Sequence, residues 1–477
     1  MSRFSVLPTY AQKTLRYLKK NGVSRTLKKI SRRISGKGWL PPDEDALFTL
    51  RPFAVPEEQL WHMPGKLVPY RGKVSVVIPA YNGAHELPGL LEALKRQQGA
   101  GELELVVVDS GSTDGTPELA EQAGARVIHI PQAEFSHSCS RRLGAENAGG
   151  EYLLFMTQDA LPDGEDWLLR LMQPALVSGA AAASCCERPR ADADLFSRIS
   201  AWTWRLLMCG GEDRLTALPE DTGYESLRRC AQLSDNACLV RRERYVAMGG
   251  HRGDYAEDLE LGIRLLRAGY RLGLLDSVSV IHSHSRPPVY YFKRAIVDAR
   301  NISSMFPDFT MDSPNLGNAV SRTATAACAD ILYLRELDRR TETGEELAQH
   351  TRERFERNIS ALRRMKGEEI QALLFDSGGL EPSVRPFMEE LWQAGGQAYH
   401  FDPVLAVSQA RYIMHYLCPY LQAKNIGADE KVKAEIPLML WQYFAQSAGY
   451  TAAACFLNAP DSEGKINAIA KKYQIGV

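Results

Sequence analysis

Short apolar runs alternate with amphipathic stretches from residue 73 onward. Val74–Ile78, Leu105–Val108 and Val127–Ile130 have the length and the β-branched character of buried strands. Leu87–Arg96 repeats leucine at helical spacing, and a second helical stretch follows the second run. Strands that alternate with helices indicate a parallel sheet with crossover helices, so the pattern predicts an α/β fold.

Two polar turns follow the first two predicted strands, at Pro79–Asn82 and at Asp109–Thr116. A right-handed crossover places both turns at one edge of the sheet, so we expect a crevice of nucleotide size there. Carboxylate, hydroxyl and backbone N–H groups suit hydrogen bonds to a base or a ribose, and glycine permits close approach. The alternative is an ordinary Asp/Ser/Gly turn that caps a helix, and for the second turn by itself this alternative is favoured.

A third polar segment ends the strand predicted for Tyr152–Met156. Thr157, Gln158 and Asp159 follow this apolar run directly. Open α/β sheets bind ligands at the carboxyl ends of their strands, so Asp159 could meet a metal ion or a phosphate. Aspartate is also a common turn residue, and the Leu-Pro that follows fits a turn. This stretch alone leaves the two interpretations equal.

The first segment of the chain is strongly basic. Residues 1–42 carry eleven Lys and Arg and no acidic residue, so the remainder of a chain with net charge −1 sums to −12. Between Ala11 and Ile34, apolar residues recur near helical spacing among these cations, which predicts one or two basic amphipathic helices. Such a face can lie on an anionic membrane, bind nucleic acid or pack on an acidic domain. We favour the anionic membrane and expect no nucleic-acid partner, because aromatic residues are sparse there.

The pattern also predicts where domains begin and end. Helical periodicity with charged faces returns near Ser321–Lys366, Pro382–Ala394 and Lys431–Leu457, and Pro437 predicts a break or a helix start. This last region offers no catalytic group, and a homo-oligomer could form through it. The predicted segments are a basic helical segment with a Gly- and Pro-rich connector (1–70), an α/β domain (71–305) and a mostly α-helical domain (306–477).

Composition narrows the class of protein. The chain of 477 residues is 45% hydrophobic and 24% charged, as in folded globular proteins. Nine cysteines without a Cys-x-x-Cys pair do not resemble a disulfide framework or a zinc site, which favours a reducing cytoplasm. The sequence shows neither an apolar run of about 18 residues nor a signal peptide, so we expect a cytoplasmic protein, peripheral on the inner face of the cell membrane. P-loop, dinucleotide-binding and zincin motifs are missing as well.

Taken in order and spacing, the polar motifs resemble the family 2 glycosyltransferases of GT-A fold, whose core is a Rossmann-like mixed sheet. The motifs that carry the resemblance are Ile78–Asn82, Val108–Thr116, Arg141–Gly144, Phe155–Ala160, Asp235–Arg242, Gly249-Gly250 and Glu257–Leu265. They span approximately residues 72 to 300. Within the family, Thr157–Ala160, Phe135–His137, and Val280–His284 followed by Phe292–Arg294 resemble the bacterial rhamnosyltransferases that use dTDP-rhamnose to build surface polysaccharide.

The sequence departs from the family pattern at three positions. Thr157 stands where the family's Asp-x-Asp motif has its first Asp, so Asp159 is the single carboxylate of that motif. Ser110 replaces a frequent second Asp, and Arg142 replaces a common Asn. Forms similar to the first two occur in the rhamnosyltransferase-like members, so we interpret them as marks of that subgroup.

The resemblance implies a role for each motif. The residues that it assigns to the nucleotide sugar are Pro79, Ala80, Tyr81, Asn82, Asp109, Ser110, Gly111, Arg141, Gln158 and Asp159. It implies that Asp159 binds Mg²⁺ or Mn²⁺ at the diphosphate, together with His282 or His284. It assigns Asp258 as the general base. Without the resemblance, both histidines could be loop residues, the arginine could anchor the fold, and Asp258 could simply favour the positive end of a helix.

These implications define the expected function. We expect an inverting glycosyltransferase that moves L-rhamnose from dTDP-rhamnose onto a growing surface polysaccharide such as O-antigen, or onto a polyprenyl-linked glycan. A second hypothesis is a hexosyl- or N-acetylhexosaminyltransferase that uses a UDP-sugar. A third is a non-catalytic GT-A-like scaffold in a glycan assembly complex, which the Thr at position 157 supports.

Overall fold

The structure is a computed structural model that describes residues 50–253, 255–311, 314–337, 341–458, 468–469 and 471–472. Arg51–Arg286 and Val297–Met311 form one compact unit, here called the sheet unit. Pro287–Ile296 and the described residues from Pro314 onward belong to a second, here called the helical unit. The basic helices expected within residues 1–42 lie outside the described residues, and the predicted segment limits stay a prediction.

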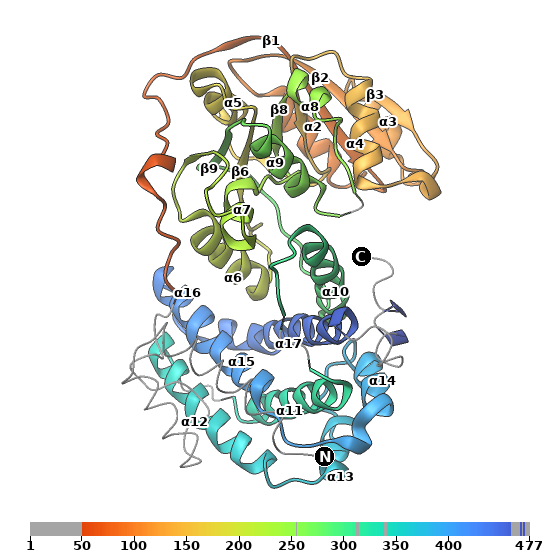
Figure 1. The fold of residues 1–477 in the computed structure, drawn as a ribbon, viewed down its shortest axis with the longest axis vertical. Helices are drawn as coiled ribbons and strands as arrows, with labels where there is room; N and C mark the ends of the chain where they lie inside the picture. Colours follow the sequence, from red (N-terminus) through yellow and green to blue (C-terminus); the bar gives the residue numbers. More distant parts are fainter. Residues whose placement is uncertain are drawn as a thin grey trace. The chain divides into compact units, whose positions relative to one another are not determined.

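Among the described residues of the sheet unit, nine strands form one mixed sheet of order β3-β2-β1-β4-β8-β6-β9-β5, with β7 paired to β9 (Figure 1). The strands are β1 (Tyr70–Ala80), β2 (Ala100–Asp109), β3 (Arg126–His129), β4 (Tyr152–Phe155), β5 (Leu161–Pro162), β6 (Ala182–Arg188), β7 (Arg214–Thr216), β8 (Cys238–Arg241) and β9 (Leu272–Ile281). β1 to β4 pair in parallel, and β8 lies antiparallel between β4 and β6. The three strands expected before residue 131 are therefore confirmed.

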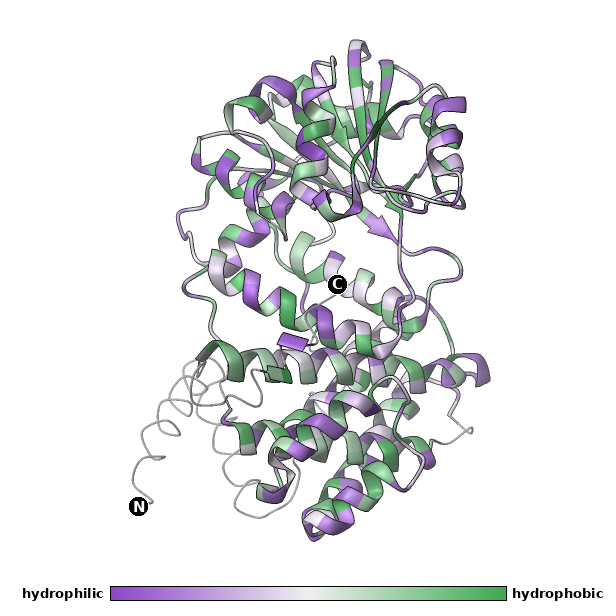
Figure 2. Ribbon diagram, turned by 90° about the vertical axis from the view of Figure 1, so that its right-hand side faces the viewer, coloured by the Kyte–Doolittle hydropathy of each residue, from purple (hydrophilic) through white to green (hydrophobic). Residues whose placement is uncertain are grey.

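Helices cover both faces of this sheet (Figure 1). They are α2 (Leu87–Lys95), α3 (Thr116–Gln122), α4 (His137–Glu146), α5 (Trp167–Ser178), α6 (Leu195–Trp204), α7 (Tyr224–Ala231), α8 (Arg242–Ala247) and α9 (Glu257–Arg267). Successive residues of β1 point to opposite faces, so Val76 and Ile78 pack with α2 and α5, whereas Val77 packs with α4, α7 and α9. In Figure 2 the strands show green, hydrophobic stretches with purple, hydrophilic residues among them. The mixed sheet between helices confirms the predicted α/β class.

The helical unit confirms the predicted α-helical C-terminal region. After α10 (Pro288–Met305), which contributes residues to both units, its helices are α11 (Leu316–Arg335), α12 (Gly344–Leu362), α13 (Gly367–Phe375), α14 (Arg385–Gly395), α15 (Val404–Tyr412), α16 (Cys418–Ala423) and α17 (Glu430–Asn458). The stretch expected near Ser321–Lys366 is divided, because Thr343 starts a new helix through a capping box with Glu346.

The break or start expected at Pro437 is wrong, because α17 continues through this residue. An interior proline costs a helix about 3 kcal/mol. Ile436, Met439 and Leu440 flank it and are buried, and each fully buried apolar side chain contributes about 1.5–3 kcal/mol. Packing therefore outweighs the local penalty.

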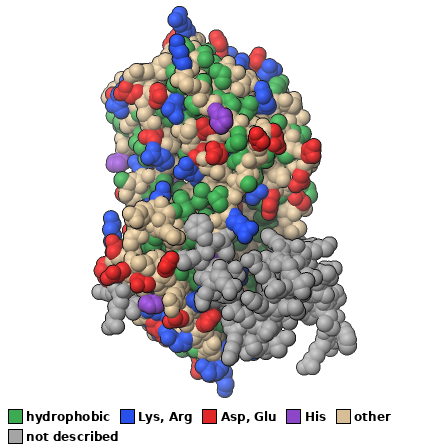
Figure 3. Space-filling model, turned by 90° about the vertical axis from the view of Figure 1, so that its left-hand side faces the viewer, with side chains coloured by type: hydrophobic (Ala, Val, Ile, Leu, Met, Phe, Trp, Pro, Cys, Tyr) green, Lys and Arg blue, Asp and Glu red, His purple; other side chains and the backbone are tan. Residues whose placement is uncertain are grey.

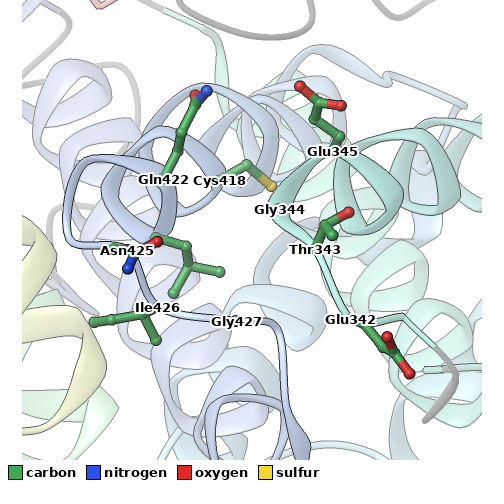
Figure 4. Close-up of a pocket in the computed structure, with 10 residues that line it drawn as sticks. Glu342, Thr343, Gly344, Glu345, Cys418, Gln422, Asn425, Ile426 and Gly427 are labelled. Atoms are coloured by element: carbon green, nitrogen blue, oxygen red, sulfur yellow. The ribbon is translucent and has the colours of Figure 1, made fainter.

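A cavity of about 310 Å³ lies within the helical unit, between the first residues of α12 and α16 (Figure 4). Thr343 and Gly344 line it from one side, and Cys418 and Gln422 line it from the other. The polar side chains around it are carboxylates, amides and a hydroxyl. None of the residues that line this cavity belongs to the predicted site, which lies in the sheet unit.

The described helices include none that combines the length and the apolar character needed to cross a membrane. On the face drawn in Figure 3, Lys and Arg side chains of the described residues are interspersed with Asp and Glu. That face therefore presents both signs of charge.

Candidate active site

The carboxyl ends of β1, β2 and β4 meet at one edge of the sheet. β1 pairs with both neighbours in parallel, and Ala80 lies opposite Asp109 at the end of β2. The turns that follow are joined to each other: the Asn82 N–H donates to Ser112 Oγ, and the Thr113 N–H donates to Asn82 Oδ1, both at 2.9 Å. The structure thus brings together the two polar turns that the sequence placed at one edge.

Asp109 is buried, with 1% of its surface exposed. Its Oδ2 accepts the N–H groups of Gly111 at 3.1 Å and Ser112 at 3.2 Å. Its Oδ1 is buried and accepts no hydrogen bond from any described residue. A buried carboxylate oxygen without a donor costs about 1–3 kcal/mol or more, so this atom lacks a partner that would offset its burial.

Gln158 braces the first turn. Its Oε1 accepts the Tyr81 N–H at 2.9 Å, and its Nε2 donates to the Tyr81 carbonyl at 3.2 Å. Gly83 makes this possible, because a Cβ there would lie 2.6 Å from Gln158 Oε1. Asn82 adopts a φ of 46°, in the left-handed region. The amide of Gln158, which the resemblance assigned to the nucleotide sugar, is thus engaged with the backbone that presents Tyr81.

The remaining predicted contacts at this edge differ in exposure. Ser110 is buried, and both its N–H and its hydroxyl donate to the Ala80 carbonyl at 3.0 Å. Gly111 is exposed and has a φ of 87°, which favours glycine. Pro79 is partly buried near the end of β1, and the Tyr81 side chain is 43% exposed. An incoming molecule would therefore meet Tyr81, Asn82 and Gly111 first.

Three predicted metal ligands lie together beyond β4 and β9. The ligand atoms of Asp159, His282 and His284 all fall within 4.8 Å of one another. His282 Nε2 lies 3.6 Å from Asp159 Oδ1, His284 Nε2 lies 3.5 Å from Asp159 Oδ2, and the two imidazole nitrogens are 3.2 Å apart. The sequence left open which histidine joins Asp159, and in the structure both do.

The ring of His282 is oriented by a carboxylate behind it. Its Nδ1 lies 2.9 Å from Glu187 Oε2 and 3.1 Å from Asn236 Nδ2. With Nδ1–H donated to Glu187, the Nε2 lone pair points to the cluster, as in metal-bound histidines. Burial disfavours the charged ring, but the hydrogen bond and the charge of Glu187 outweigh burial and raise the pKa of His282.

This donor set fits a divalent ion. Asp159 supplies a hard oxygen, the two imidazoles suit a first-row transition ion, and Glu187 orients one of them. Mn²⁺ fits the set better than Mg²⁺, because Mg²⁺ prefers oxygen ligands throughout.

Arg141 lies inside the fold, with 3% of its surface exposed. Its Nε is 2.9 Å from Asp235 Oδ2, and its Nη1 donates to Glu257 Oε1 at 3.0 Å. Two buried carboxylates thus engage its charge, as in the alternative in which this arginine anchors the fold. Its assignment to the nucleotide sugar stays a prediction.

Asp258 is the second residue of α9 and is partly buried. Its Oδ1 accepts the Leu259 N–H at 2.7 Å, and its Oδ2 accepts the Asp235 N–H at 3.3 Å. Burial, followed by the charges of Asp235 and Glu257, raises the pKa of Asp258 to about 8. A carboxylate with a pKa near neutral pH is suited to take a proton from a hydroxyl group.

One dipeptide connects Asp258 with the cluster of Asp159 and the histidines. Asp235 and Asn236 lie just before β8, which runs antiparallel to β4 and so begins at the edge where β4 ends. The backbone of Asp235 contacts Asp258, and the side chain of Asn236 contacts His282. The candidate base and the candidate metal ligands therefore flank the same two residues.

Sequence reasoning missed the roles of Glu187 and Asn236. Glu187 is the second-last residue of β6, which pairs in parallel with β9 so that Glu187 lies opposite Val280, two residues before His282. The available signal was an acidic residue at the end of an apolar run, Ala180–Cys186. Nothing local in the sequence shows that this run pairs with the strand before His282.

Known proteins resemble part of this chain. A family model described as Glycosyl transferase family 2 matches residues 75–231. The O-antigen chain rhamnosyltransferase RfbN of Salmonella typhimurium is 26% identical over 231 residues, which cover 46% of this chain and 70% of the relative. The succinoglycan biosynthesis protein ExoA of Rhizobium meliloti is 28% identical over 215 residues, which cover 43% of this chain and 62% of the relative.

Among solved structures, the mannosyltransferase PcManGT from Pyrobaculum calidifontis, in complex with GDP-Man and Mn²⁺, aligns with a TM-score of 0.40 at 17% identity. The alignment covers 74% of this chain and 89% of that chain. The family match confirms the resemblance that the motifs indicated, and together with the mixed sheet it confirms the predicted GT-A fold class.

Proposed function

Residues 75–231 form a glycosyltransferase domain of family 2, and on this premise we propose that the protein transfers L-rhamnose from dTDP-rhamnose to a growing bacterial glycan. The observation that carries the proposal is the placement of Asp258 and of the Asp159, His282 and His284 cluster on either side of Asp235-Asn236. Two relatives bear the name O-antigen chain rhamnosyltransferase, which favours rhamnose as the sugar and a surface polysaccharide as the product.

The donor would lie along the edge formed by β1, β2 and β4. Asp109 Oδ1 would accept the ring N–H of thymine, which satisfies an oxygen that has no donor among the described residues. Asp159, His282 and His284 would hold a divalent ion, which supplies positive charge to offset the departing diphosphate. Asn82 and Ser112 would bring their joined turns against the nucleoside.

Asp258 would act on the acceptor. Its carboxylate takes the proton of the acceptor hydroxyl, whose oxygen forms a bond to the anomeric carbon of rhamnose as the bond to the diphosphate breaks and dTDP leaves. This single displacement inverts the anomeric centre. A pKa of about 8 gives the carboxylate a driving force to accept the proton, and the fraction of Asp258 that is ionised and able to act as the base grows as pH rises toward 8.

A panel of donors tests the proposal. dTDP-rhamnose, UDP-glucose and UDP-N-acetylglucosamine would be titrated calorimetrically into the full chain with and without Mn²⁺, and turnover would follow on polyprenyl-linked glycan acceptors. We expect dTDP-rhamnose to bind best, to need Mn²⁺ and to be turned over. Preferred turnover of a UDP-sugar would establish the second candidate, which Asp109 also suits because uracil carries the same ring N–H. Binding of donors without turnover on any acceptor would favour the scaffold.

Two further hypotheses rest on the sequence. We propose that residues 1–42 attach the protein to the inner face of an anionic membrane, since they carry eleven basic and no acidic residues. Cell fractionation of the full chain and of a variant without residues 1–42 checks this, and equal membrane recovery of both would contradict it.

Light scattering of the full chain tests the homo-oligomer expected through residues 306–477.

A further inference from the structure

A cluster of buried polar side chains lies behind Asp258, and the proposed reaction does not use it. Arg141, Asp235, His251 and Glu257 are all at least nine-tenths buried, and His251 is 0% exposed. They come from α4, from the turn before β8, from the loop before α9 and from α9 itself. Burial of this many ionisable groups is costly unless each has a defined partner, so we expect their arrangement to serve a function.

The imidazole of His251 is held from both sides. The His251 backbone N–H donates to Tyr245 Oη at 3.2 Å, and the same hydroxyl lies 3.0 Å from His251 Nδ1. On the other side, Nε2 lies 3.2 Å from Asp235 Oδ2 and 3.3 Å from Oδ1. Since a carboxylate only accepts, Nε2 carries a hydrogen toward Asp235. The rings of Phe155 and Tyr245 pack against His251 at centroid distances of 4.7 and 5.4 Å.

Asp235 passes this constraint to Asp258. Its side chain is held by His251 and by Arg141, while its backbone N–H donates to Asp258 Oδ2 at 3.3 Å. Arg141 also binds Glu257, the residue directly before Asp258. The position of the Asp258 carboxyl group is therefore set through its own helix and through the Asp235 peptide.

We propose that His251 is a positioning residue for the reaction: its Nε2–H fixes Asp235, and Asp235 in turn holds the Asp258 carboxyl group in place for the acceptor hydroxyl. This inference rests on the proposed function, because it takes Asp258 as the base. His251 itself touches neither Asp258 nor the metal cluster among its described contacts.

The charges around Asp258 determine the direction in which its pKa should move when one of them is removed. The titratable groups that face Asp258 or its neighbour Asp235 in the described residues are His137 and Arg141 from α4, Cys238 from β8, Tyr245 from α8, His251, and Glu257 from α9. Burial raises the pKa of Asp258 most, the charges of Asp235 and Glu257 add to it, and Arg141 opposes it. Removal of the Asp235 charge, with its backbone N–H kept, therefore lowers the pKa of Asp258.

The test measures donor turnover against pH in His251→Phe, His251→Gln and Asp235→Asn, with exposed His62→Phe as the matched control. We expect His251→Phe to lower kcat by up to about 100-fold with donor KM unchanged, because it keeps the ring and loses the donor. His251→Gln restores an N–H toward Asp235 and should recover most of kcat. Asp235→Asn should shift the rising limb of the profile to lower pH, and His62→Phe should match the parent.

Equal losses in His251→Phe and His251→Gln, together with an unmoved limb in Asp235→Asn, would show a merely structural role and overturn the inference. If His251→Phe does not fold, the other two variants still decide. Asp258→Asn distinguishes a failure of the role proposed for His251 from a failure of the proposed function. An inactive Asp258→Asn with those negative results leaves the proposed function standing and removes only the role of His251. Full turnover by Asp258→Asn overturns both.

Discussion

Asp258 shows how one side chain can be suited to catalysis at a cost to stability. Its pKa of about 8 lies well above the ordinary value of 3.8, because the fold buries it beside Asp235 and Glu257. As pH rises through this interval, the unfolded chain releases the proton and the folded chain retains it. The contribution of Asp258 to the free energy of unfolding, which is fully present below its ordinary pKa of 3.8, is therefore lost as pH rises to about 8.

Asp258→Asn should be stabilised relative to the parent by an amount that grows with pH. Asparagine has no proton to lose, so the difference in free energy of unfolding between variant and parent should rise between about pH 4 and pH 8 and level off above. Urea unfolding at a series of pH values measures it. A difference that is constant over this range would show that Asp258 is ionised throughout.

Glu187 provides the second prediction for a single side chain. Glu187→Ala removes the acceptor of His282 Nδ1–H, so the imidazole loses its fixed orientation toward the cluster. We expect Mn²⁺ affinity to fall by about 10- to 100-fold. Glu102→Ala is the matched control, because Glu102 is exposed and its carboxylate forms an ion pair with Lys73. Calorimetric Mn²⁺ titrations that coincide for parent and Glu187→Ala would contradict the assignment.

Elements that depend on local signals could be predicted from the sequence, and elements that depend on distant pairing could not. The turns after β1 and β2 follow from the crossover rule, and the structure joins them through Asn82. Glu187 and His251 reach their partners only when β6 pairs with β9 and when the loop before α9 meets Asp235. Glu187 and His282 are 95 residues apart and His251 and Asp235 are 16 apart, and no periodicity in the sequence indicates either contact.

The turn between β1 and α2 should be sensitive to one methyl group. In Gly83→Ala the new Cβ would displace the Gln158 amide from Tyr81, and two hydrogen bonds of about 1 kcal/mol each are at stake. We expect dTDP to bind roughly 5- to 10-fold more weakly by calorimetry. Gly65→Ala, with nothing within 4 Å of its Cβ, should bind dTDP as the parent does. Unchanged affinity in Gly83→Ala would show that Gln158 does not support this turn for nucleotide binding.

The close contact of α4 with β1 predicts that alanine substitutions at two helical glycines, one in α4 and one in α2, change the free energy of unfolding in opposite directions. A Cβ at Gly144 would lie 2.3 Å from Val77 Cγ1, so Gly144→Ala should destabilise by about 1–3 kcal/mol. At Gly89 in α2 the nearest atom is 3.8 Å away, so Gly89→Ala should stabilise by about 0.5–1 kcal/mol. Urea unfolding followed by circular dichroism compares them. Equal shifts for both variants would be inconsistent with the close approach of α4.

For the whole chain, the sequence predicted the class of each region better than its connections. The α/β texture and the helical C-terminal region are both present. The position of β8, antiparallel between β4 and β6, could not be predicted, because a long segment that holds α5 to α7 separates β8 from β4 in the chain. This position of β8 brings Asp235-Asn236 to the edge where β4 ends, and so it determines the candidate site.

Turnover by Asp258→Asn, measured beside its affinity for dTDP, shows most directly whether Asp258 is the general base. The variant keeps the nucleotide edge and the metal cluster and loses only the base. We predict that kcat for dTDP-rhamnose falls by about 10²- to 10⁴-fold while the Kd for dTDP in the presence of Mn²⁺ stays that of the parent. A variant that turns over dTDP-rhamnose at the parental rate would contradict the assignment of Asp258 as the base.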